Sequence, residues 1–414
     1  MKLLAALALA AALVGVAAAR AQAAPPLYQV RSLPTLGGYA EGVSLNNRDW
    51  VAGPSDLADG TRNATLWRND VPQSLGTLGG PYSSVQWPVK NVRGVVSGIA
   101  ETGETDPLGE DWSCSVFFPA VTHHKCLGFV WRNGSMHALP TLGGNNGFAT
   151  GTNDRGETVG WAENTVHDPG CTGRHQVLQF RAVIWGPKPG SISELPPLPG
   201  DKVSAATAIN DTGQAVGISG ICDQAVGRFS AIHSVLWEHG SAREIPNLGG
   251  VAWNTPMAIN RWGDVVGFSN ISAADGGGFN AHGFVWFNGS PQSIDLVPFQ
   301  GDAYTQALGI NDERQVVGLS CTLGFGSCRG FIWQNGVMTN LNTVAPGYGG
   351  YLVSADDIND QGEISGLAVD QGAAVPFVAT PDSTAPPSAQ HATAEVLLPG
   401  SARQALLRRL GLSR

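Results

Sequence analysis

Residues 307–318 read ALGINDERQVVG and residues 330–336 read GFIWQNG, and these two stretches contain the phrase that decides the fold. The phrase is an apolar segment ending in Ile-Asn, a polar turn, Val-Val-Gly, a variable loop, and an apolar segment with Trp before an Asn-Gly turn. Its first half occurs seven times, at residues 45–53, 90–98, 152–160, 209–217, 259–267, 310–318 and 358–366. Regular repetition on this scale is typical of solenoids and β-propellers.

The second half of the phrase has the same count if a phenylalanine is accepted in the last copy. Its aromatic positions are Trp67, Trp131, Trp185, Trp237, Trp286, Trp333 and Phe377. The 354 residues from Leu27 to Thr380 give about 51 residues per copy, which is room for four strands of about five residues with their turns. We name these strands A (ending in Ile-Asn), B (Val-Val-Gly), C (the Trp strand) and D.

The turn residues favour strands. The Asn-Asp-x-Gly tetrads at 153–156, 210–213 and 359–362 suit a type I turn followed by a glycine at positive φ, between strands A and B. Asn-Gly pairs at 133–134 and 335–336 are hairpin signals between strands C and D. The tetrads lack the alternating carboxylates of a calcium loop, so we interpret them as turns.

The two ends of the repeat region complement each other. The last copy has strands A, B and C, but a Pro/Ser/Ala-rich stretch follows where strand D should be. An orphan D-like strand, residues 27–33, precedes the first copy. If it completes the last sheet, the ring closes and no strand edge is left open. We therefore predict an all-β fold, a seven-bladed β-propeller of four-stranded blades closed by the N-terminal strand, with six or eight blades as the counting error.

The repeat resembles the HAF repeat of bacterial extracellular proteins. The phrases that carry the resemblance are residues 78–80, 208–211, 283–286 and 335–338. No copy reads His-Ala-Phe in full, and only His233 and His282 keep a histidine near that position. The resemblance covers about 350 residues and implies export. It carries no established activity, so it transfers no catalytic residues.

Composition and the terminal segments set the domain organisation. Only 14% of the 414 residues are charged, against about 25% in an average domain, and this low charge excludes a coiled coil. The 43% of apolar residues exclude disorder of the whole chain. Residues 1–23 are typical of a secretory signal peptide. Their apolar run, residues 3–19, is short and alanine-rich for a transmembrane anchor. We expect the propeller over residues 24–380. Residues 381–414 form a Pro/Ser/Ala-rich linker and a short basic tail, disordered or a short helix.

The charge balance argues against nucleic acid as a partner. Residues 24–379 hold 18 basic and 31 acidic residues, a formal charge of −13. A body that acidic repels phosphate backbones. The sequence indicates no cofactor and no metal site, and it leaves the oligomeric state open.

All six cysteines fall in connections between strands B and C. In an exported chain an even number of cysteines predicts disulfides. The pairs expected from proximity are Cys114–Cys126, Cys321–Cys328, and Cys171–Cys222 between the third and fourth blades. The longest of these connections are residues 99–127 and 161–180. Such braced loops on one rim are either a binding surface or insertions protected from proteolysis.

An aromatic residue follows the Gly-Gly turn, or its equivalent, in six copies. The candidate ligand-binding residues are these aromatics and nearby polar residues: Tyr39, Tyr82, Phe148, Trp253, Tyr304, Tyr351, Asn145, Asn146, Asn254, Asp201 and Asp302. Aromatic faces with amides and carboxylates nearby could bind a sugar beside the channel. The alternative is that each ring packs against its neighbouring blade.

Acidic and histidine residues gather in the second copy: Glu101, Glu104, Asp106, Glu110, Asp111, His123 and His124. They match no known metal-ligand spacing, and an acidic solvated loop explains them. No common hydrolase or nucleotide motif is present, so no catalytic residue is assigned.

From these features we predict a secreted or periplasmic, non-enzymatic binding propeller whose loop-rich face engages a carbohydrate or an extracellular protein. One alternative is a polysaccharide hydrolase or lyase that uses a carboxylate pair among Glu101, Glu104, Asp106 and Asp201. A second alternative is a structural surface or matrix protein.

Overall fold

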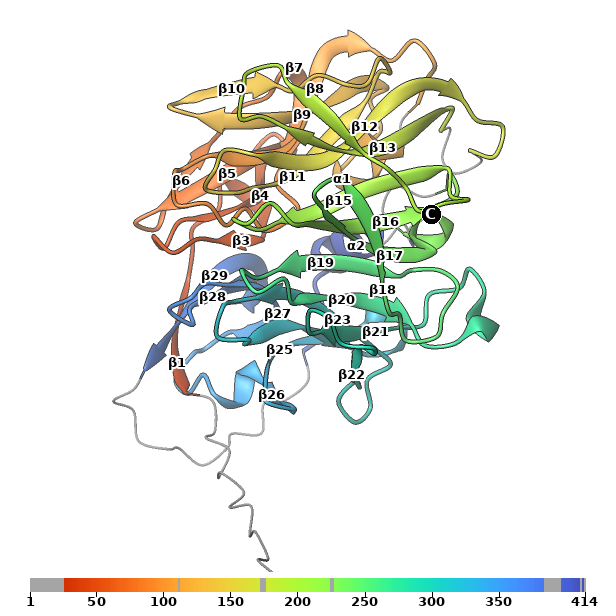
Figure 1. Ribbon diagram of the computed structural model, residues 1–414. Coiled ribbons are helices and arrows are strands. Elements are labelled where there is room, and N and C mark those ends of the chain that lie inside the picture. Colours follow the sequence, from red (N-terminus) through yellow and green to blue (C-terminus); the bar gives the residue numbers. More distant parts are fainter. Residues whose placement is uncertain are drawn as a thin grey trace, which may run out of the picture.

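The computed structural model describes residues 26–110, 112–171, 176–223, 227–382, 396–409 and 412. Seven antiparallel sheets lie around a central axis, so the predicted seven-bladed β-propeller is confirmed (Figure 1). The expected signal peptide, residues 1–23, lies outside the described residues.

Each blade follows the predicted order A, B, C, D from the axis outward. Blade 1 contains Gly37–Ala40 (β2), Ser44–Leu45 (β3), Val51–Leu57 (β4), Arg62–Arg68 (β5) and Val71–Ser74 (β6), with strand A split into β2 and β3. Blade 2 contains Gly79–Ser84 (β7), Val96–Thr105 (β8), His124–Arg132 (β9) and Ser135–Ala138 (β10). Blade 3 contains Gly147–Thr152 (β11), Thr158–His167 (β12), Leu178–Trp185 (β13) and Ile192–Leu195 (β14).

The next three blades keep this pattern. Blade 4 contains Val203–Ile209 (β15), Ala215–Gly220 (β16), His233–Glu238 (β17) and Ser241–Ile245 (β18). Blade 5 contains Thr255–Ile259 (β19), Val265–Asn270 (β20), Ala281–Trp286 (β21) and Ile294–Leu296 (β22). Blade 6 contains Tyr304–Ile310 (β23), Val316–Cys321 (β24), Cys328–Gln334 (β25) and Val337–Asn340 (β26).

Blade 7 closes the ring with strands from both ends of the propeller. It contains Tyr351–Ile358 (β27), Ile364–Asp370 (β28), Ala373–Asp382 (β29) and the N-terminal strand Leu27–Ser32 (β1), in the order β1-β29-β28-β27. The register pairs Leu27 with Asp382 and Ser32 with Phe377. Figure 1 shows β1 beside β29, as the orphan strand predicted.

The short helices lie outside the blades. They are Trp112–Phe117 (α1), Gly400–Arg409 (α2), and the 3-10 turns Arg228–Ala231 (η1), Ala273–Asp275 (η2), Leu323–Phe325 (η3) and Leu341–Thr343 (η4). No helix among the described residues is long and apolar enough to cross a membrane. We call the side formed by the B–C and D–A connections the loop face, and the side formed by the A–B and C–D turns the turn face.

Asparagines at the A–B turns link neighbouring blades. Asn210 accepts hydrogen bonds from the backbone N–H groups of Thr212 and Gln214, which shapes the turn, while its Nδ2 donates to the Asn260 carbonyl at 3.0 Å. The same link to the asparagine of the next blade is made by Asn46, Asn153, Asn260, Asn311 and Asn359, and Asn91 donates instead to the carbonyl of Thr152 in blade 3. The bond from Asn359 returns to the carbonyl of Asn46, so the cycle is closed around the channel.

Tryptophans of the C strands link blades near their outer edge. The indole N–H of Trp237 donates to the carbonyl of Pro196, which follows strand D of the preceding blade, at 2.7 Å. Trp67 and Trp185 make the same bond to Pro34 and Pro140. In these three blades the tryptophan and the proline that follows strand D bind each other across a blade interface, whereas Trp286 donates to the Ser290 carbonyl of its own blade.

Candidate functional site

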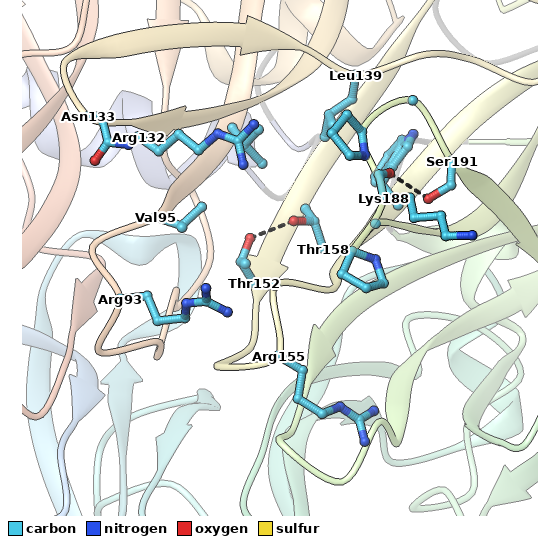
Figure 2. A pocket seen from close by; sticks show the side chains of 17 residues that line it. Arg93, Val95, Arg132, Asn133, Leu139, Thr152, Arg155, Thr158, Lys188 and Ser191 are labelled. Carbon is cyan, nitrogen blue, oxygen red and sulfur yellow. Dashed lines mark hydrogen bonds between the residues drawn. The ribbon is translucent and has the colours of Figure 1, made fainter.

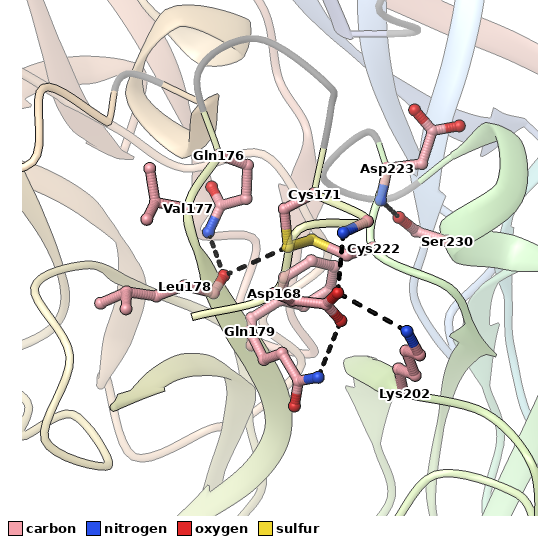
Figure 3. The surroundings of a disulfide bond; sticks show 12 residues. Asp168, Cys171, Gln176, Val177, Leu178, Gln179, Lys202, Cys222, Asp223 and Ser230 are labelled. Atoms are coloured by element: carbon pink, nitrogen blue, oxygen red, sulfur yellow. Dashed lines mark hydrogen bonds and ion pairs between the residues drawn. A yellow bond between two sulfur atoms is a disulfide. The ribbon is translucent and has the colours of Figure 1, made fainter. Parts of the chain in front are cut away.

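Disulfides brace the loop face in three places. The bonds Cys114–Cys126, Cys171–Cys222 and Cys321–Cys328 are all present, which confirms the predicted pairing. Cys171–Cys222 ties the loop of blade 3 to that of blade 4, and beside it Asp168 bonds Gln179 and pairs with Lys202 (Figure 3). The loops are shorter than expected, because β8 extends to Thr105 and β9 begins at His124.

The six predicted aromatic residues lie in one apolar cluster at the loop-face end of the channel. Four of them, Tyr39, Phe148, Trp253 and Tyr351, are buried, and the other two are partly buried. Tyr82 stacks on Phe118 with ring centroids 5.5 Å apart, and Tyr304 stacks on Phe325 at 5.0 Å. The structure thus brings the rings together, and their burial agrees with the packing alternative. A ligand role for Tyr82 and Tyr304 stays a prediction.

The five predicted polar residues are held by bonds within the protein. Asn254 is fully buried and bonds Ser269, Ile232 and Gly250. Asp201 and Asp302 each accept a hydrogen bond from a serine of strand B in their own blade, Ser219 and Ser320. The other two, Asn145 and Asn146, donate backbone N–H groups to Glu163.

Helix α2 covers the same end of the channel. Leu398, Ala402 and Leu406 are buried in the cluster that holds the aromatic residues. Arg403 bonds the Gly324 carbonyl of blade 6, and Arg408 bonds the Phe118 carbonyl of blade 2. The tail therefore forms the short helix allowed by its sequence, and this helix spans the loop face, lying beside α1 in Figure 1.

A buried carboxylate network joins the loops of blades 2 and 3. Oε1 of Glu110 accepts the N–H groups of Val177 and Leu178, and Asn146 bridges Asp106 and Glu163. Burial and the nearby Glu110 raise the pKa of Glu163 to about 8. Burial also raises the pKa of Glu110. The hydrogen bonds of Glu110 and Asn146 hold the loops of blades 2 and 3 together.

The remaining candidates of the acidic loop lie apart from this network. Glu101 is buried and bonds Thr122, whereas Glu104 is exposed and pairs with Lys125. Asp111 lies outside the described residues. Within the described part of the chain, no group of three His, Cys, Asp or Glu side chains is placed to hold a metal ion.

Exposed apolar side chains gather on the loop face. Of the twelve large exposed apolar residues in the described chain, seven belong to B–C connections, D–A connections or the tail: Leu108, Val121, Ile221, Val251, Val297, Leu323 and Leu397. An eighth, Val166, lies at the loop-face end of β12. Leu323 and Leu397 are the most exposed of all, at 77% and 78%. Apolar surface of this kind is what contacts with another macromolecule use.

The turn face carries a pocket that sequence reasoning missed. It has a volume of about 380 Å³ and lies between blades 2 and 3, with Arg93, Arg132 and Lys188 on its walls (Figure 2). Arg93 and Lys188 lie in turns of two different repeats, and Arg132 ends strand β9. No pattern in the sequence marked them, because the same kinds of turn also carry acidic residues such as Asp154 and Asp211.

Comparisons with known proteins report similar folds without a family. No family model matches the chain, and no curated protein matches it. AofleA from Arthrobotrys oligospora is 12% identical, covering 76% of this chain and 88% of that chain with a TM-score of 0.34. An oligogalacturonate lyase in complex with manganese is 10% identical, covering 87% and 98%, with a TM-score of 0.38. A Trypanosoma rangeli sialidase in complex with sialic acid is 11% identical, covering 86% and 60%, with a TM-score of 0.38.

Proposed function

We propose that the chain is an exported, non-enzymatic binding propeller of the HAF-repeat type. Its loop face contacts an extracellular macromolecule, and a carbohydrate is the first class to test. The gathering of exposed apolar side chains on disulfide-braced loops carries this proposal. Loops held rigidly on a scaffold lose little conformational entropy on binding, which favours affinity.

Three further features support the proposal. Disulfides persist in oxidising compartments, which agrees with export. The residues at the channel end are packed under α2 and bonded to one another, so contact would fall on the outer surface of the loops. Tyr82 and Tyr304 are only partly buried, so they stay candidates for stacking on a sugar.

A glycan array and a pull-down with insoluble polysaccharides test this function. We expect saturable binding that falls at least tenfold in the double variant Val121→Ser/Leu323→Ser. The matched control is Val71→Ser/Val337→Ser, which removes the exposed valines that begin strands β6 and β26, directly after C–D turns of the turn face. Binding at background level, or equal loss in both variants, would refute a role for the loop face.

A further inference from the structure

The pocket between blades 2 and 3 has an unusual charge. Seventeen residues line it, and they include Arg93, Arg132, Arg155 and Lys188 but no Asp or Glu. The whole chain holds 24 basic and 33 acidic residues, so a wall with four cations and no carboxylate departs sharply from its average. Like charges gathered without a counter-ion repel one another, and a bound anion relieves that repulsion.

Three of these four cations are available to a ligand. Arg155 is engaged, because its guanidinium bonds Glu157 at 2.6 Å and points away from the pocket in Figure 2. Arg93 donates one N–H to the backbone carbonyl of Asp154 at 3.1 Å. A backbone carbonyl is uncharged, so the positive charge of Arg93 is not neutralised by this bond. Within the described chain, Arg132 and Lys188 have neither an ion pair nor a side-chain hydrogen bond.

The rest of the wall is mostly apolar or already bonded. Val95, Val130, Leu139 and the buried Trp185 supply apolar surface. The hydroxyls of Thr152 and Thr158 bond each other. Apolar walls with a few charged groups are typical of small-molecule sites, and the volume of about 380 Å³ falls in their usual range.

The arrangement also sets the kind of anion. Arg93 and Arg132 line the pocket from blade 2, and Lys188 lines it from blade 3, with its ammonium group directed away from the two arginines in the view of Figure 2. Guanidinium groups pair with two oxygens of a carboxylate or sulfate. A long polyanion would meet the acidic surface of the chain, whereas a single anionic group would not.

We propose that this pocket binds a small organic oxyanion: a carboxylate or sulfate group on a body of about one sugar ring. Arg93 and Arg132 hold the anionic group, Lys188 adds attraction from the other blade, and the apolar wall contacts the ring. The pocket belongs to the turn face, so the proposal stands independently of the function proposed for the loop face.

Calorimetric titration of the full chain tests the site with three probes. Glucuronate carries both the anion and the ring, glucose has only the ring, and inorganic sulfate has only the anion. We expect saturable binding of glucuronate, binding of sulfate at least tenfold weaker, and none of glucose. If sulfate binds as well as glucuronate, the proposed role of the apolar wall is wrong. No saturation by glucuronate up to about 10 mM, or equal binding of glucose, would overturn the whole proposal.

Paired variants assign any binding to this pocket. Arg132→Gln/Lys188→Gln should weaken glucuronate binding at least tenfold. The control Arg48→Gln/Arg243→Gln removes two exposed arginines outside the pocket, and with them the same net charge. Circular dichroism and melting curves establish that both variants are folded. Equal weakening in the two variants would show a general charge effect and would contradict the proposed site.

Discussion

At the scale of single residues, the repeated asparagine of the A–B turn has two roles. Its Oδ1 shapes the turn within one blade, and its Nδ2 bonds the next blade. All seven of these asparagines are buried. A buried amide that loses its partners costs about 1–3 kcal/mol, so each position is under strong constraint.

Replacement of Asn210 by alanine tests the link between blades. We expect a loss of about 1–3 kcal/mol in the free energy of unfolding, measured with denaturant, because the Asn260 carbonyl loses its donor. Asn247→Ala is the control, since Asn247 makes only local bonds to Gly249 and Gly250. A loss no larger than that of the control would show that the asparagine cycle contributes nothing beyond the turns.

Glu163 makes stability depend on pH. Its pKa is raised to about 8, so the fold binds the proton more tightly than the unfolded chain does. This contribution is fully present below the ordinary pKa of a glutamate and is lost as the pH rises through about 8. The melting temperature should therefore fall between pH 5 and pH 9, roughly the range between the two pKa values.

Glu163→Gln, which resembles the protonated form, should flatten this dependence and melt above the parent protein at the alkaline end. The control is Glu313→Gln, which changes an exposed glutamate. Parallel curves for Glu163→Gln and the parent protein would contradict the assignment.

At the scale of elements, each disulfide stabilises the fold according to the chain segment that it closes. Cys171–Cys222 closes 51 residues and joins two blades, whereas Cys321–Cys328 closes 7 residues within one blade. Chain entropy gives about 4 kcal/mol for the longer segment and roughly 2.5 kcal/mol for the shorter one.

Replacing each pair by serines tests this order. Cys171→Ser/Cys222→Ser should lower the free energy of unfolding more than Cys321→Ser/Cys328→Ser, as measured by denaturant unfolding without reductant. The shorter bridge is the internal control. Cys222, Cys321 and Cys328 are buried, and Cys171 is partly buried. A reversed order would show that local packing outweighs the constraint on the unfolded chain.

At the scale of the whole molecule, ring closure depends on β1. This strand pairs with β29 along its full length, and Tyr28 is buried in blade 7. Without β1 the outer edge of β29 would expose unpaired backbone groups, which promote association with other chains.

Deletion of residues 1–33 should give a chain that aggregates and loses cooperative unfolding, seen by size-exclusion chromatography and thermal melting. Deletion of residues 396–414 is the control. It removes α2 from the loop face and leaves every blade complete, so that chain should stay cooperative and bind more of a hydrophobic dye. A cooperative monomer after loss of residues 1–33 would refute closure by β1.

The blade count, the closure and the disulfide pairing could all be read from the sequence. The Asn-Asp-x-Gly turns and the Trp strands are set by residues close together in the chain, and they recur at a regular spacing. Residues 27–33 supply the one strand that the last copy lacks. One copy of this turn-and-strand pattern would predict little, but seven copies predict seven blades, because each blade is built from the same kind of strands and turns. The cysteine pairs followed once the blade order was known.

Only the tertiary structure decided which surfaces are open. Tyr39, Phe148, Trp253 and Tyr351 are buried because rings from separate blades converge at one end of the channel, where α2 covers them. Likewise, Arg132 and Lys188 lie 56 positions apart in the sequence, and only the packing of blade 2 on blade 3 puts them on one pocket. Turns depend on neighbours in the chain, whereas burial and charge clusters depend on which distant segments meet.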